Sequence, residues 1–278
     1  MTKWRLLLSR SKDPYTNMAI DEAILKSYSQ GQSSPTLRIY GWSPESISLG
    51  YFQKANKVLK VDQCLNHGVL FVRRITGGEA IYHGSDLTYS IICSKNDLGL
   101  PESVKESFKL IASFLIGAYK KHGLDACFSV EDEERENYFD IKQKKRSDFC
   151  FATNQDFDIT IAGRKIGGNA QKRRRDIIFQ HGSIPLHLDL NRVSLFLREE
   201  LDGVEERIVS LSSAAGKIID FDGFSAVLID SFQETFGLKL TLGELTAEEK
   251  QKAAELRKNK YANGDWNFYA DTQKAGVA

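Results

Sequence analysis

Helical and strand-like patterns of apolar residues alternate along this chain. Apolar residues recur at helical spacing in three segments, which predict amphipathic helices over residues 14–28, 102–122 and 221–236. Asp13 before Pro14 is typical of a helix start, and Gly237 is typical of a helix end. A shorter helix is expected over residues 55–67. Each helix therefore has an apolar face that must pack against another element.

Strand-like runs lie between these helices. They are short runs rich in apolar residues, and they cover residues 36–40, 46–49, 69–74, 87–93, 156–161 and 177–186. Several of them follow one another without a helix between them and are joined by turns that contain glycine. The pattern therefore predicts a mixed, largely antiparallel sheet flanked by helices, which is an α+β fold. Neither GxGxxG nor the P-loop motif occurs, and this disfavours a Rossmann or P-loop fold.

The composition is that of an ordinary globular protein, with 278 residues of which 41% are hydrophobic and 27% charged. We expect one main domain over residues 1–245, a helical extension over 246–269 and a disordered tail over 270–278. Thr246 with Glu249 three residues later is a capping-box pattern and predicts the start of the extension helix, which is expected to end near residue 260.

Charge and hydropathy exclude several classes of partner. The formal net charge of +1 argues against bulk electrostatic binding of nucleic acid. No apolar run approaches the ~20 residues that a membrane-spanning helix needs. The first residues also lack the apolar core of a signal peptide. We therefore expect a cytoplasmic protein that binds neither nucleic acid nor a membrane.

The four cysteines are Cys64, Cys93, Cys127 and Cys150, and they show no CxxC pairing. No pair of ligands follows Cys64 at the spacing of a zinc site. We therefore expect reduced thiols, most of them buried as small apolar residues, and no metal site.

A glycine-containing loop with a single lysine follows the strand predicted over residues 156–161. Gly163 supplies a turn, and Lys165 then stands just before Gly167, Gly168 and Asn169. Glycine lets the backbone approach a ligand closely, because there is no Cβ in the way. One cation beside bare backbone N–H groups suits a carbonyl, a carboxylate or a phosphate. The alternative is a hairpin turn whose lysine is solvated.

A second glycine loop follows the strand predicted over residues 69–74. Arg73 and Arg74 end that strand, and Thr76, Gly77 and Gly78 come next. Two guanidinium groups, a hydroxyl and a glycine pair could together hold an anion or a carboxyl group. The alternative is a β-hairpin that carries surface arginines.

Seven short stretches, taken in order, resemble the lipoate/biotin protein ligase and octanoyltransferase superfamily. They are residues 17–23, 73–78, 82–83, 87–90, 163–171, 181–183 and 260–267. No single stretch is decisive, but the ordered set is highly specific and spans about residues 4–269. The resemblance implies the fold of the biotin and lipoate protein ligases, which is related to class II aminoacyl-tRNA synthetases. The main domain would then be an acyltransferase or ligase catalytic domain.

The resemblance also implies that a medium-chain acyl group lies in a tunnel near the two glycine loops. The candidate substrate-binding residues are then Arg73, Arg74, Thr76, Gly77, Gly78, His83, Gly167, Gly168 and Asn169. Two positions depart from the ligase pattern, because Glu79 follows the Thr-Gly-Gly run and Gly84 follows His83. Both departures count against nucleotide binding more than against the fold.

Residues 147–151 resemble the cysteine segment of the LipM-type octanoyltransferases, in which that cysteine carries the acyl group. ATP-dependent lipoate ligases form an acyl-adenylate instead and usually have an Asn-Asp-like segment here. By this resemblance Cys150 is the candidate nucleophile and Lys165, fifteen residues later, its catalytic partner. A lysine ammonium within about 4–6 Å of a thiol favours the thiolate. The alternative is that Cys150 is a buried apolar thiol.

The function expected on this basis is octanoyl transfer. Cys150 would take octanoate from octanoyl-acyl carrier protein and pass it to a lysine of a lipoyl-domain protein. The acceptor would be the glycine cleavage H protein or a 2-oxoacid dehydrogenase subunit, and no cofactor would be needed. Three alternatives remain open: an ATP-dependent lipoate–protein ligase, an amidotransferase between lipoyl domains, and an acyl- or carrier-binding protein without turnover.

Two basic runs, at residues 142–146 and 172–175, have a possible use in docking. Acyl carrier proteins and lipoyl domains are typically acidic, and charges at the rim of an interface raise association rates. Simple solvation is the alternative for either run. The first run belongs to a charged stretch, residues 131–146, that is expected to be a surface loop.

Overall fold

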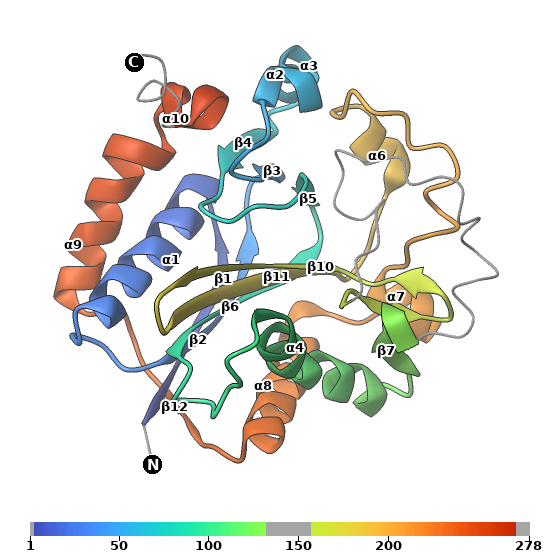
Figure 1. Cartoon of the computed structure of the whole chain (residues 1–278). Helices are drawn as coiled ribbons and strands as arrows, with labels where there is room; N and C mark the ends of the chain where they lie inside the picture. Colours follow the sequence, from blue (N-terminus) through green and yellow to red (C-terminus); the bar gives the residue numbers. More distant parts are fainter. Residues whose placement is uncertain (1–2, 132–156, 271–278) are drawn as a thin grey trace.

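The computed structural model describes residues 3–131 and 157–270 (Figure 1). Its centre is a six-stranded sheet with the strand order β10-β11-β6-β2-β1-β12. The bounds are β10 (Gly168–Arg174), β11 (Ile177–Pro185), β6 (Asp86–Ser94), β2 (Thr36–Trp42), β1 (Trp4–Lys12) and β12 (Leu240–Leu242). β1 pairs in parallel with both of its neighbours, and the other pairs are antiparallel. The sheet is therefore mixed, as predicted.

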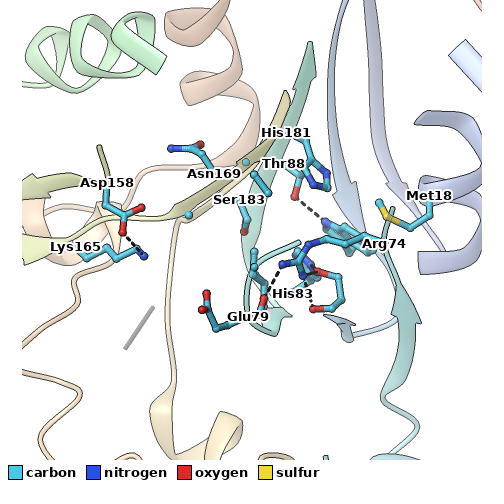
Figure 2. A pocket seen from close by; sticks show the side chains of 17 residues that line it. Met18, Arg74, Glu79, His83, Thr88, Asp158, Lys165, Asn169, His181 and Ser183 are labelled. Carbon is cyan, nitrogen blue, oxygen red and sulfur yellow. Dashed lines mark hydrogen bonds and ion pairs between the residues drawn. The ribbon is translucent and has the colours of Figure 1, made fainter. Parts of the chain in front are cut away.

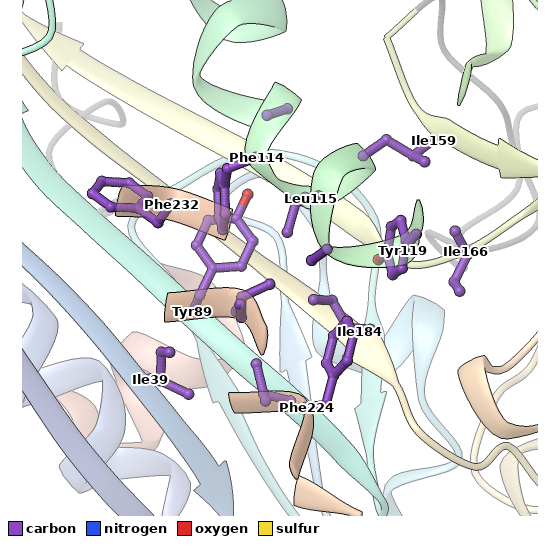
Figure 3. Close-up of a cluster of buried hydrophobic side chains, with 14 of the residues drawn as sticks. Ile39, Tyr89, Phe114, Leu115, Tyr119, Ile159, Ile166, Ile184, Phe224 and Phe232 are labelled. Atoms are coloured by element: carbon purple, nitrogen blue, oxygen red, sulfur yellow. The ribbon is translucent and has the colours of Figure 1, made fainter. Parts of the chain in front are cut away.

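The two faces of this sheet carry different helices (Figure 1). α4 (Val104–Lys121) and α8 (Phe221–Phe236) cover one face, and α1 (Pro14–Ser29) and α9 (Ala247–Leu256) cover the other. Consecutive residues of a strand contact different helices, because their side chains point to opposite faces of the sheet. Leu6 and Ile91 pack with α4 and α8, whereas Leu7 and Ile92 pack with α1. Figure 3 shows the larger cluster, in which Phe114 of α4 contacts both Tyr89 of β6 and Phe232 of α8.

The helix ends follow the local signals in the sequence. The side chain of Asp13 accepts a hydrogen bond from the Thr16 backbone N–H at 3.0 Å and caps α1. α8 ends at Gly237, which adopts the left-handed conformation with φ of 60°. Thr246 and Glu249 form both bonds of the predicted capping box at the start of α9. These three predictions are confirmed.

A smaller sheet with the order β4-β3-β5 lies beside the first. Its strands are β4 (Leu70–Arg73), β3 (Ser46–Leu49) and β5 (Ile81–His83), and it packs near α2 (Ala55–Val58), α3 (Val61–Asn66) and α6 (Leu190–Ser194). The single helix predicted over residues 55–67 is wrong. Leu59 has an extended backbone and forms an isolated bridge with Leu197, so it separates α2 from α3.

A third, three-stranded sheet has the order β7-β8-β9. Its strands are β7 (Ala126–Phe128), β8 (Ile159–Ile161) and β9 (Arg164–Lys165). A 3₁₀ turn (Ser129–Glu131) follows β7, and the short helix α7 (Leu211–Ala215) follows α6 in the chain. The antiparallel pair β8–β9 forms the hairpin that carries Lys165.

The C-terminal helices pack back onto the N-terminal part of the chain. Glu249 of α9 pairs with Arg5 of β1 at 2.6 Å, and Lys260 pairs with Glu22 of α1 at 2.8 Å. Lys260 lies in a π-helical turn (Arg257–Tyr261) that precedes α10 (Gly264–Tyr269). Apart from Ala270, the tail predicted over residues 270–278 lies outside the described residues. Within the described ranges, no helix has both the length and the apolar character needed to cross a membrane.

Candidate functional site

A pocket lies where the six-stranded sheet, the smaller sheet and the β8–β9 hairpin meet (Figure 2). Its walls come from α1, β2, β3, β5, β6, β10 and β11 and from the loop after β4. The lining residues include Met18, Trp42, Ser48, Arg74, Gly78, Glu79, His83, Thr88, Asp158, Lys165, Gly168, Asn169, His181 and Ser183. Residues from both predicted glycine loops therefore face one space.

The hairpin that carries Lys165 is built by its turn. Ala162 and Gly163 both have positive φ, 48° and 73°, between β8 and β9. A two-residue turn with both central residues at positive φ matches the twist of the flanking strands. The turn predicted at Gly163 is therefore confirmed. Lys165 is only 2% exposed, so the interpretation of a solvated lysine is wrong.

Lys165 forms a buried ion pair on the pocket wall. Its Nζ lies 2.7 Å from Oδ2 of Asp158, which is 6% exposed and lies just before β8. Burial of an isolated charge is costly, so a partner of opposite sign is expected at such a position. Sequence reasoning missed Asp158. The available signal was an acidic residue between Phe157 and Ile159, in a run whose neighbouring residues pack in the core.

Gly167 and Gly168 lie in different surroundings. Gly167 has φ of 86°, and a Cβ there would lie 2.5 Å from the backbone oxygen of Ser183. Close approach at Gly167 is therefore to β11 and not to a ligand. Gly168 and Asn169 line the pocket at the start of β10, and their role in substrate binding stays a prediction. The side-chain oxygen of Asn169 also accepts a hydrogen bond from the Tyr89 hydroxyl at 2.7 Å.

Arg73 is buried and does not line the pocket. Its guanidinium donates to six backbone carbonyls, those of Gly50, Tyr51, Gln53, Trp266, Asn267 and Phe268. Three of these carbonyls belong to α10 and three to the turn after β3. We therefore assign Arg73 a structural role, joining the C-terminal helix to that turn, instead of the predicted substrate contact.

Arg74 lines the pocket and shapes the loop that follows it. Its NH2 donates to the carbonyls of Gly77 and Glu79 at 2.8 and 2.7 Å, and its NH1 donates to the carbonyl of Ser48 at 2.9 Å. Both arginines are at most 2% exposed, so the alternative of surface arginines is wrong. Gly78 lines the pocket with φ of 88°, whereas Gly77 is not among the lining residues.

Thr76 is not among the lining residues, but it contacts a histidine that lines the pocket. Its hydroxyl lies 2.7 Å from Nε2 of His181, which lines the pocket on β11. Burial, and after it the electrostatic effect of the nearby Arg74 and His83, lowers the pKa of His181 to about 3. His181 is therefore neutral at physiological pH. This neutral ring holds the loop between β4 and β5 against the sheet.

The predicted residue His83 belongs to a polar network on the pocket floor. Its Nδ1 lies 2.9 Å from Oδ2 of Asp86, and its Nε2 lies 2.9 Å from the Ser48 hydroxyl. The ring stacks on Trp42 with centroids 3.8 Å apart. The same Asp86 oxygen accepts hydrogen bonds from the hydroxyls of Thr88 and Ser183. These contacts fix the floor, which leaves an enclosed space with Lys165 and Asp158 on one side and Met18 on the other (Figure 2).

The predicted nucleophile, Cys150, lies outside the described residues, as does the basic run at residues 142–146. The three described cysteines are Cys64, Cys93 and Cys127, and none of them lines the pocket. Burial raises the pKa of Cys64 to about 11 and the pKa of Cys93 further. A thiol with a raised pKa is a poor nucleophile at neutral pH.

Known structures share this fold over nearly the full chain. Lipoate-protein ligase A bound with ATP superposes with a TM-score of 0.78 and 26% identity, covering 96% of this chain and 99% of that chain. The bipartite lipoate protein ligase of Thermoplasma acidophilum, solved in a study with its E2 lipoyl domain, has a TM-score of 0.78 at 25% identity, covering 97% and 98%. The fold is therefore that of the lipoate protein ligases, as the sequence resemblance implied.

The chain belongs to the family of the lipoyl protein ligase A/B catalytic domain, whose model matches residues 13–233. Within it, the chain is similar to octanoyltransferase LipM of Kyrpidia tusciae. The two are 38% identical over 276 residues, which cover 96% of this chain and 99% of the relative. The resemblance to the LipM-type octanoyltransferases is confirmed.

Proposed function

We propose that this protein is an octanoyltransferase that moves octanoate from acyl carrier protein to a lysine of a lipoyl domain. The observation that carries the proposal is the similarity to octanoyltransferase LipM along nearly the whole length of both chains. The buried Lys165 on the pocket wall supports it, because a cation there suits a reaction with an anionic nucleophile. The cytoplasmic location expected from the sequence is part of this proposal.

The proposed reaction has two transfers. The Cys150 thiolate attacks the thioester carbonyl of octanoyl-acyl carrier protein, a new carbon–sulfur bond forms, and the carrier thiolate leaves and takes up a proton. The neutral ε-amine of the acceptor lysine then attacks the octanoyl-enzyme. An amide bond forms, the bond to Cys150 breaks, and the amine loses its proton. Splitting the transfer in this way is the usual advantage of a covalent intermediate.

Lys165 and the two glycine loops have separate parts in this scheme. The Lys165 ammonium stabilises the thiolate and assists proton movement. In both transfers a tetrahedral oxyanion develops, and backbone N–H groups are suitable donors to it. Gly78 and Gly168 both line the pocket, which favours the backbone near these two positions as the source of the donors. The scheme needs no cofactor.

The acceptor is proposed to be the glycine cleavage H protein or a 2-oxoacid dehydrogenase subunit. The similarity to a lipoate ligase that was solved in a study with its E2 lipoyl domain supports a lipoyl-domain acceptor. An ATP-dependent lipoate ligase is the second candidate, because the fold also matches a ligase that was solved with ATP bound.

Intact-mass measurement separates these functions. Wild-type protein incubated with octanoyl-acyl carrier protein and without ATP is expected to gain the mass of one octanoyl group. Cys150→Ala is expected to gain none, whereas the matched control Cys127→Ala reacts like wild type. Full transfer activity in Cys150→Ala would overturn the thioester scheme.

Two further incubations test the alternatives. Lipoylation of an apo-lipoyl domain that requires free lipoate, ATP and magnesium would show a ligase instead. Octanoylated lipoyl protein that replaces the carrier as the better donor would show an amidotransferase.

A further inference from the structure

The hairpin that carries Lys165 is anchored in the main core. Ile159, Ile161 and Ile166 are all buried in the cluster that also contains Leu115 and Tyr119 of α4. Figure 3 shows Ile159 and Ile166 beside this helix. Asp158 and Lys165 each stand next to one of these anchors in the sequence. Both backbones at the ion pair are therefore attached to a packed element and not to a free loop.

Backbone hydrogen bonds fix the same two residues. The N–H of Lys165 donates to the carbonyl of Arg207 at 2.8 Å, and its carbonyl accepts from the N–H of Val209 at 3.0 Å. The carbonyl of Asp158 accepts from the N–H of Ser129 at 2.8 Å. The backbone is thus held without help from the ion pair. What the backbone leaves open is the direction of the lysine side chain, whose four-carbon stem has many rotamers.

The carboxylate of Asp158 restricts that direction. Both side chains are almost fully buried, with 3% and 8% of their surface exposed, and both line the pocket. The 2.7 Å contact between Nζ and Oδ2 places the ammonium at the pocket wall (Figure 2). An ammonium in this setting has little access to water that could replace the carboxylate.

We infer that Asp158 is a positioning residue for octanoyl transfer, because it holds the Lys165 ammonium at the pocket wall. This inference rests on the proposed function. Asp158 itself need not touch the substrate, and its effect on the reaction passes through Lys165. The role therefore predicts that the two residues act as one unit.

A double-mutant cycle tests this dependence. Asp158→Asn is expected to lower kcat about 100-fold, the size of loss that misplacement of a catalytic group produces, with KM for octanoyl-acyl carrier protein within about twofold of wild type. Asp158→Glu keeps the carboxylate and is expected to recover most of kcat. In a Lys165→Met background, Asp158→Asn is expected to change kcat by less than about twofold, because the residue through which Asp158 acts is already gone.

The double variant also protects the test against a folding failure. Lys165→Met/Asp158→Asn replaces both charges and Asp158→Glu keeps both, so these two variants can be measured even where Asp158→Asn does not fold. Independent, multiplicative losses of kcat in the cycle would overturn the inference. So would a kcat for Asp158→Asn within about threefold of wild type.

A matched control separates positioning from general damage to the fold. Glu249→Gln removes a buried carboxylate from Arg5, at 2.6 Å, away from the pocket. It is expected to lower the melting temperature and leave kcat unchanged. Each kcat ratio compares a variant with wild type in the reaction that wild type catalyses, whether or not that reaction uses ATP. If wild type forms no octanoyl adduct, the proposed function is rejected, but the kcat ratios still test the role of Asp158.

Discussion

At the scale of single residues, Gly167 shows why the loop that carries Lys165 requires glycine. Its φ is positive, and a Cβ at this position would lie 2.5 Å from the Ser183 carbonyl oxygen, so both features exclude larger residues. Gly167→Ala is expected to lower the free energy of unfolding by about 2–3 kcal/mol, as measured by urea denaturation. Gly264→Ala is the control, because a Cβ there meets no atom within 4 Å. Equal stability of the two variants would contradict this account.

Met18 is the residue that we expect to limit acyl-chain length. It lines the pocket from α1, on the side opposite Lys165 in Figure 2. Under the proposed function, the acyl carbonyl lies near Lys165 and the end of the chain points towards Met18. Met18→Ala is expected to raise the ratio of kcat/KM for decanoyl over octanoyl carrier protein about 10-fold or more, the discrimination that methylene groups give in an apolar pocket. An unchanged ratio in competition assays would show that the chain ends elsewhere.

At the scale of helices and strands, the contact between α1 and the C-terminal π-helical turn carries a pH dependence. Burial raises the pKa of Glu22, but Lys260, Tyr261 and Lys26 outweigh this effect and lower the pKa to about 2. The ordinary value is 4.5. A carboxyl group with a lowered folded-state pKa stabilises the fold above its unfolded pKa, and this contribution is lost as the pH falls towards the folded value.

Glu22→Gln is therefore expected to reduce the pH dependence of stability between pH 4.5 and about 2. The contribution at neutral pH is about 2–3 kcal/mol. Melting temperatures measured from pH 7 to pH 2.5 for both proteins check this. Parallel curves for wild type and Glu22→Gln would show that this carboxylate makes no such contribution.

The elements that the sequence predicted well are those with local signals. Asp13, Gly237 and the pair Thr246–Glu249 define helix ends within a few residues of chain, so their patterns needed no knowledge of packing. Strand β10 was missed because its cationic residues look like a solvated loop. It is an edge strand, and charged side chains are common on such edges. The break at Leu59 depends on a bridge to Leu197, far along the chain, and no local pattern reports it.

At the scale of the whole molecule, the sequence placed both glycine loops at one site because the ordered motifs resemble one family. It did not show which polar side chains hold the fold together instead of lining the site. Arg73 and Arg74 have the same local context, yet only Arg74 lines the pocket, because the C-terminal helix takes the donors of Arg73. Asp158 and Asp86 were missed for a related reason. A buried carboxylate is recognised by its partners, and the fold decides which partners it meets. Lys165 reaches Asp158 only when β8 and β9 form a hairpin, and Ser183 reaches Asp86 only when β11 pairs with β6.

The cationic end of β10 is expected to attract the acidic carrier protein. The chain has a net charge of only +1, so attraction of an acidic carrier or lipoyl domain must come from a local cluster of charge. Residues 172–174 end an edge strand whose first residues line the pocket, and Arg175 forms the turn that follows. Reversal of Arg173, Arg174 and Arg175 to Glu is expected to lower kcat/KM for octanoyl-acyl carrier protein about 10-fold at low salt.

Because the proposed attraction is a long-range charge effect, the loss should largely disappear at about 0.5 M salt, where charges are screened over a few ångströms. The matched control reverses Lys250, Lys252 and Lys258 on the C-terminal helices, which changes the net charge equally at residues that do not line the pocket. Steady-state kinetics across a salt series compares the two triple variants. If both lose the same activity, net charge and not the end of β10 attracts the carrier; if neither loses activity at low salt, β10 has no part in docking.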